Sequence, residues 1–259
     1  MSTMNKTTLL LLSCPMVCLG ISCSSPYQMT GVERTRILVD EKYDQYTDAA
    51  VEAFIAPYRQ QVDSMMSPVV GHSAAYMNAT RPEGTLSNLL ADILVWSGQF
   101  YDEQPDFAVY NMGGIRSALG KGEVTKGDVV DIAPFENKVC FVTLSGTHVL
   151  QLFREIASTG GEALSHGVEL QITPEGQLLE AKLFGNSIQP DKHYRVATID
   201  YVALGNDHME AFKLSTDSNM PKAETNNVRY IIMKYLQEMA SKGVAVNAAI
   251  EGRIKIVQQ

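Results

Sequence analysis

Asn111-Met112-Gly113-Gly114-Ile115-Arg116 is the stretch of this sequence that says most about fold and site together. It directly follows Asp106–Tyr110, a short run that is typical of a strand, and the paired glycines predict a turn where that strand ends. Glycine allows the backbone to approach a ligand closely, and Arg116 adds a guanidinium to the same space. The segment is therefore a candidate ligand-binding turn.

Two further segments carry residue types that bind ligands. Pro134-Phe135-Glu136-Asn137 places a ring and an amide in a loop, and Tyr201 to His208 places a ring, a glycine turn and the carboxylate of Asp207 after a strand. Each segment alone is compatible with an ordinary turn. Together with the first segment they supply rings to sandwich a base, amides to read its edge, a carboxylate for ribose hydroxyls and an arginine for phosphate. The combination predicts a nucleoside or nucleotide site.

Composition limits the size of the domain and the class of partner. The chain has 259 residues, of which 45% are hydrophobic, so it is long enough to bury a substantial core. Its 21 basic and 29 acidic residues give a net charge of −8, and we expect no nucleic acid partner because no global field attracts a polyanion. A smaller anion is a separate matter, since a few arginines can hold a phosphate inside an acidic protein.

Hydrophobic spacing predicts helices and strands that are intermixed along the chain. Several predicted strands are adjacent in sequence, which favours an α+β fold, a mixed sheet flanked by helices, over a doubly wound one. Helices are expected at about 47–66 and 85–98, with Thr85 as a cap, then after a Ser145 cap, and finally around Val228–Met239. Strands are expected at Asp106–Tyr110, Val139–Leu144, Val168–Ile172, Leu178–Phe184, Tyr194–Ile199 and Arg253–Val257, with a polar connection at about 213–226.

The N-terminus predicts export. Residues 1–22 combine a short basic start with the apolar run Thr7–Ile21, which is too short to span a bilayer and is typical of a signal peptide. Cys23, just after that run, resembles the lipidated first residue of a bacterial lipoprotein, with 23–47 as a tether and 48–259 as one domain. An ordinary signal cleaved near Ser22 and a retained anchor are the alternatives. We expect a lipid-anchored protein of the bacterial cell envelope, with Cys140 as a buried small hydrophobe.

The motifs then occur in an order that resembles a known family. Asn-x-Gly-Gly-Ile-Arg is followed by Gly122 to Thr125, Pro-Phe-x-Asn, Leu-Ser-Gly, Tyr194 to Thr198 and the aromatic–Gly–Asp segment. This order is similar to that of the C-terminal domain of the 5'-nucleotidase and UDP-sugar hydrolase family over roughly residues 48–257. The resemblance implies an α+β domain that binds the nucleoside part of a substrate.

The resemblance also implies roles for individual residues. Phe135 and Tyr201 would clamp the base, Asn111 and Asn137 would hydrogen-bond it, and Asp207 would hold the ribose hydroxyls. Arg116 would contact phosphate, with Arg81 as a further phosphate contact. The sequence departs from the family pattern at Met112, where glycine is usual, and at Tyr201, where phenylalanine is usual. Asn206 and His208 replace glycines, which narrows the pocket or changes its specificity.

Family members hydrolyse phosphate esters with two metal ions held by a separate N-terminal domain. We expect that domain to be absent from this chain, so no catalytic residue and no metal or other cofactor is predicted here, and the chain alone is expected to be inactive. Asp191-Lys192-His193 and Gly205-Asn206-Asp207-His208 superficially resemble metal motifs, but both fall inside the matched region and are expected to be surface residues.

Three functions stay open at this point. The first is substrate recognition alongside a separate metallophosphatase chain that holds the divalent metals. The second is a free-standing nucleotide- or nucleoside-binding lipoprotein without a catalytic role. The third, an autonomous hydrolase that uses the stray histidines, is the weakest.

Overall fold

The structure, a computed structural model, describes residues 29–43 and 47–258. The predicted signal peptide and the predicted lipidation site at Cys23 lie outside the described residues. A boundary between two compact units falls between Ala53 and Phe54. In the first unit, residues 29–43 are exposed and end in a short 3-10 turn, η2 (Glu41–Tyr43).

Helices and strands are intermixed along the second unit and several strands follow one another directly, as the sequence predicts. Its helices are α2 (Ala49–Met66), which starts just before the boundary, α3 (Thr85–Ser97), α4 (Lys126–Ile132), α5 (Gly146–Ser158), α6 (Asp200–Ala203) and α7 (Val228–Ser241). Its strands are β1 (Val69–Ser73), β2 (Phe107–Tyr110), β3 (Gly122–Thr125), β4 (Val139–Ser145), β5 (Ala163–Leu164), β6 (Val168–Ile172), β7 (Leu178–Leu183), β8 (Asn186–Ser187), β9 (His193–Ile199), β10 (Thr216–Asn219) and β11 (Ile254–Ile256).

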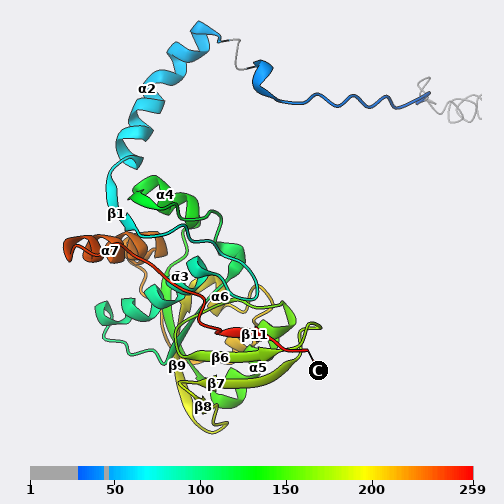
Figure 1. The fold of residues 1–259 in the computed structure, drawn as a ribbon, viewed down its shortest axis with the longest axis vertical. Coiled ribbons are helices and arrows are strands. Elements are labelled where there is room, and N and C mark those ends of the chain that lie inside the picture. The colour runs from blue at the N-terminus through cyan, green and yellow to red at the C-terminus, as the bar shows by residue number, and fades with distance from the viewer. Residues whose placement is uncertain (1–28, 44–46, 259) are drawn as a thin grey trace, which may run out of the picture. The chain divides into compact units, whose positions relative to one another are not determined.

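The strands form a mixed arrangement, which confirms the α+β prediction. The largest sheet has the order β10-β4-β9-β2-β5, and within it β2 runs parallel to β9 while the other pairs are antiparallel. A second sheet has the order β11-β6-β7-β8, and Figure 1 shows β11 lying beside β6. The strands β1 and β3 form a separate antiparallel pair.

The core lies around the central strands of the largest sheet. All four side chains of β2 are buried, as expected for a strand inside the sheet that is apolar throughout. On α5, Ser145 caps the first turn by accepting a hydrogen bond from the His148 amide, and Phe153 packs against Phe107 with ring centroids 5.4 Å apart. Cys140 is buried as predicted, and burial raises the pKa of its thiol to about 12.

Two local predictions are corrected by the structure. The N-cap of α3 is Gly84 rather than Thr85, and the Ser87 hydroxyl accepts the Gly84 amide at 3.1 Å. The polar connection at 213–226 contains β10, which pairs with β4. Its sequence, Thr-Asp-Ser-Asn, has no alternation of apolar and polar residues that would predict a strand. The segment is extended because it pairs with β4.

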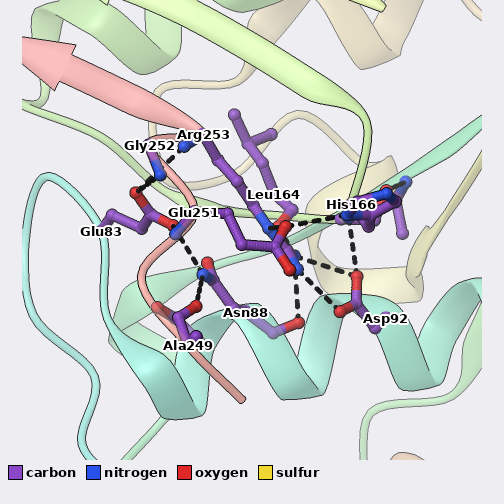
Figure 2. A network of polar contacts seen from close by, with 12 residues as sticks. Glu83, Asn88, Asp92, Leu164, His166, Ala249, Glu251, Gly252 and Arg253 are labelled. Atoms are coloured by element: carbon purple, nitrogen blue, oxygen red, sulfur yellow. Dashed lines mark hydrogen bonds and ion pairs between the residues drawn. The ribbon is translucent and has the colours of Figure 1, made fainter. Parts of the chain in front are cut away.

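A polar network fastens the C-terminal segment to α3 (Figure 2). The carboxylate of Glu83 accepts the backbone amides of residues 251, 252 and 253 at 2.8, 2.9 and 3.0 Å. The buried guanidinium of Arg253 donates to both oxygens of Asp92 and to the carbonyl of Leu164. Because the guanidinium is buried, these hydrogen bonds offset the free-energy cost of removing its charge from water. They also hold β11 beside β6.

Candidate functional site

The sheet order brings the three predicted segments to one edge. The strands β2 and β9 are parallel, so the turn after β2 and the helix α6 after β9 lie at the same end of the sheet. The strand β4 is antiparallel to β9, with Val139 opposite Ile199, so the loop before β4 reaches that end too. Segments far apart in the sequence therefore converge because of strand direction alone.

Five of the predicted residues line one small cavity. Its lining consists of Asn111, Gly113, Phe135, Asn137, Tyr201 and Asp207, and its volume is about 220 Å³. The rings of Phe135 and Tyr201 are 46% and 39% exposed, so neither is a core residue. The volume is below the ~300–1,000 Å³ typical of pockets that enclose a whole small molecule. A ligand of nucleotide size would extend beyond this cavity.

Asp207 is the polar centre of the cavity. Its Oδ2 accepts a hydrogen bond from Asn111 Nδ2 at 2.5 Å, and its Oδ1 accepts one from the Tyr201 hydroxyl at 3.0 Å. The bond to this carboxylate raises the pKa of Tyr201, which keeps the phenol protonated as a donor. Asp207 itself has a left-handed φ of 54°, a conformation that aspartate tolerates better than most residues. The carboxylate is thus held from two sides, with lone pairs left for further donors.

Asn111 is oriented by Asp207, and the glycines beside it leave room for that arrangement. Its side-chain oxygen Oδ1 is buried and has no hydrogen-bond partner within the described residues. A Cβ on Gly114 would lie 2.7 Å from this oxygen, so the turn requires glycine there. Asn111 Nδ2 carries two N–H groups and donates one to Asp207, so the bond to a base that the resemblance implies would fall to the second N–H.

The two predicted phosphate contacts lie outside this cavity. Arg116 is exposed and lines a separate small hollow, with its guanidinium 3.5 Å from the carbonyl of Gly113. Arg81 donates from Nε to the Gly161 carbonyl at 2.7 Å and from Nη2 to the carboxylate of Glu162. Both arginines are therefore tied to the turn that contains Gly113, Arg116 through the Gly113 carbonyl and Arg81 through Glu162, whereas the two rings line the cavity.

Glu162 is a residue that the sequence analysis missed. Its buried carboxylate accepts hydrogen bonds from Arg81 and from the backbone amide of Met112, inside the candidate turn. Burial is the main cause that raises the pKa of Glu162. The only signal in the sequence is an acid between Gly160-Gly161 and the apolar pair Ala163-Leu164, which by itself does not indicate a partner.

The histidines do not form part of the cavity. His193 begins β9 and His208 follows Asp207, and both are exposed. Across residues 29–43 and 47–258, no three His, Cys, Asp or Glu side chains lie close enough to hold a metal ion together. A larger hollow of about 1,000 Å³ lies along α7, but it contains none of the predicted site residues.

A match to a family model shows to which protein family the chain belongs. Residues 69–214, more than half of the chain, match the model described as "5'-nucleotidase, C-terminal domain". The chain belongs to this family. The matched range includes the three segments that line the cavity, and membership supports a nucleotide-related function.

Similar proteins are longer than this chain. Protein UshA of Yersinia enterocolitica is 26% identical over 164 residues, which are 62% of this chain and 30% of that protein. The trifunctional nucleotide phosphoesterase protein YfkN of Bacillus subtilis is 26% identical over 238 residues, 85% of this chain and 16% of that protein. The chain thus spans less than a third of either relative.

Solved structures show the same fold. The 5'-nucleotidase precursor of Thermus thermophilus matches with a TM-score of 0.69 and 25% identity, over 81% of this chain and 43% of that one. The NAD nucleotidase of Haemophilus influenzae matches with a TM-score of 0.60 and 22% identity, over 81% and 41%. In the part of the chain that the structure describes, no helix is long and apolar enough to cross a membrane.

Proposed function

We propose that this chain is the nucleotide- or nucleoside-recognition domain of a 5'-nucleotidase-type system and works with a separate metallophosphatase chain. The observation that carries the proposal is the convergence of Phe135, Tyr201, Asp207 and the two amides around one cavity. Exposed rings beside a carboxylate that already has two donors suit a base and a ribose.

In this proposal the ligand lies across the edge of the sheet. The base stacks on the rings, Asn111 and Asn137 bond its edge, and the ribose hydroxyls donate to the remaining lone pairs of Asp207. The phosphate projects out of the small cavity toward Arg116, which donates to the Gly113 carbonyl, and Arg81, which is tied to the Met112 amide through Glu162. This layout explains why the cavity is smaller than a complete nucleotide.

The proposal leaves the chemistry to a partner. The family's two-metal catalysis needs bridging Asp, His and Asn ligands. The motifs found in this sequence match the substrate-binding domain instead, so we assign the divalent metals to a metallophosphatase chain and no cofactor to this one. The apolar run before Cys23 supports export with a lipid anchor in the bacterial envelope.

Calorimetric titration with adenosine, AMP and 2',3'-dideoxyadenosine tests ligand recognition. Wild type is expected to bind adenosine more tightly than the dideoxy analogue, because only adenosine donates to Asp207. Asp207→Asn is expected to shrink that difference, since the charge that strengthens the bonds is lost. Failure of the wild type to bind adenosine or AMP at all would refute the proposed function.

A phosphate-release assay tests the division of labour. The chain alone is expected to release no phosphate from AMP with Mn²⁺, Co²⁺ or Zn²⁺, whereas an exported metallophosphatase from a neighbouring reading frame restores release when added. Binding without any such restoration would favour the free-standing binding lipoprotein. Metal-dependent release by the chain alone, lost in His193→Ala or His208→Ala, would instead support an autonomous hydrolase.

A further inference from the structure

Glu162 is a buried carboxylate directly behind the candidate turn. Its side chain is only 2% exposed, and it follows the paired glycines at the end of α5. Removing a carboxylate from water is costly unless the protein supplies charged and hydrogen-bonding partners. The identity of those partners indicates what this residue does.

One carboxylate joins two parts of the candidate site. Oxygen Oε2 accepts the backbone amide of Met112, which lies between Asn111 and Gly113. Oxygen Oε1 accepts Nη2 of Arg81 and lies 3.5 Å from the hydroxyl of Thr159. The turn that lines the cavity and the outlying arginine are therefore held at a fixed separation by a single side chain.

The guanidinium of Arg81 is fixed by hydrogen bonds, yet its side chain stays partly exposed to solvent. Its Nε is bonded to the Gly161 carbonyl and its Nη2 to Glu162, yet its side chain is 44% exposed. An arginine otherwise loses considerable rotamer freedom when it binds an anion, and a guanidinium already fixed along one edge loses less. The rest of the guanidinium stays accessible to a ligand.

A comparable ion pair lies outside the candidate site. Glu103 and Arg195 form a double hydrogen bond at 2.7 and 2.6 Å, with side chains 12% and 16% exposed, and neither residue lines the cavity. Glu162 differs because both of its main partners belong to the candidate site. Asp207 also raises the pKa of Glu162, as the smallest of the causes behind burial, because the two carboxylates are near enough to repel each other.

We propose that Glu162 is a positioning residue, which aligns Arg81 and the Met112 amide so that the phosphate end of a bound nucleotide meets a preset guanidinium. This inference rests on the proposed function. It makes Glu162 more important for nucleotides than for nucleosides, because Arg81, the side chain that it holds, is a predicted phosphate contact and does not line the cavity.

The test compares AMP with adenosine by calorimetric titration on the full chain. Glu162→Gln is expected to weaken AMP about tenfold, the equivalent of one lost charge-assisted hydrogen bond, and to change adenosine less than about twofold. Glu103→Gln is the matched control: it removes a comparable ion pair elsewhere and is expected to keep the wild-type AMP-to-adenosine ratio. An unchanged ratio in Glu162→Gln would overturn the inference.

A double variant shows whether Glu162 acts through Arg81. In an Arg81→Met background, Glu162→Gln is expected to cause no further loss of AMP affinity, because the residue being aligned is already gone. A full additional loss would assign Glu162 a role independent of Arg81 and refute the positioning role. If Glu162→Gln does not fold, Glu162→Asp, which keeps the charge but shortens the reach, is expected to show the same selective loss.

The proposed function and this inference fail in different ways. If the wild-type protein binds neither adenosine nor AMP, both the proposed function and the positioning role of Glu162 are refuted. Wild type that binds adenosine and AMP equally well removes the phosphate contact and hence the positioning role, while nucleoside recognition survives.

Discussion

Truncation of Phe135 to alanine tests whether its ring binds ligand or stabilises the fold. The ring is 46% exposed, so roughly half of the ~150–250 Å² that a fully enclosed aromatic buries, or about 100 Å², is covered by protein. At ~25 cal/mol per Å² the loss of that contact costs at most about 2.5 kcal/mol of folding free energy, and less where the loop relaxes. A base stacked on the ring contributes ~1–3 kcal/mol to binding.

Phe135→Ala is therefore expected to lower adenosine affinity by about 5- to 150-fold with a modest loss of stability. Calorimetric titration gives the affinity, and thermal unfolding followed by circular dichroism gives the stability. Tyr230→Ala is the matched control, since Tyr230 is 41% exposed and lies outside the cavity. The buried Phe212 gives the opposite pattern, a loss of ~3–5 kcal/mol in stability on truncation.

Wild-type affinity for adenosine in a folded Phe135→Ala protein would refute the stacking argument. So would equal affinity losses in Phe135→Ala and Tyr230→Ala, because a general loosening of the fold, rather than a lost stack, would then explain both.

Three further predictions follow from other residues. Arg116→Ala is expected to weaken AMP roughly tenfold more than adenosine, because only AMP carries the phosphate; equal losses in a titration would remove that role. Cys23→Ser is expected to leave the membrane fraction, since each buried acyl CH₂ contributes ~0.8 kcal/mol to anchoring, and wild-type fractionation of the variant would contradict lipidation. The hydrogen bonds from Arg195 lower the pKa of Glu103 in the folded chain, so this pair stabilises the fold above the unfolded-state pKa of ~4.3, and that contribution is lost as pH falls through the folded-state pKa. In urea denaturation at a series of acidic pH values, the unfolding free energy of Glu103→Gln is accordingly expected to fall less steeply with decreasing pH than that of wild type. The same pH dependence in both proteins would show that the pair contributes little.

Features that depend only on residues close together in the chain can be predicted from the sequence. The Ser145 cap and the break after β2 follow from short-range hydrogen bonding and glycine geometry, so they are visible in a few letters. The residues of the candidate cavity were identifiable for the same reason, because each stands in a turn beside a strand and the family order ties the turns together.

Which of these residues come into contact depends on how the strands and helices pack. Asn111 and Asp207 are 96 positions apart, and they come into contact because β2 and β9 run parallel in one sheet. Arg81 and Glu162 are 81 positions apart, and nothing in the local pattern around either one indicates the other. Burial makes the pairing obligatory, since an isolated carboxylate at 2% exposure is too costly to keep charged, but burial itself is set by how distant elements pack. Contacts of this kind depend on strand order and direction, which periodicity and turn chemistry do not specify.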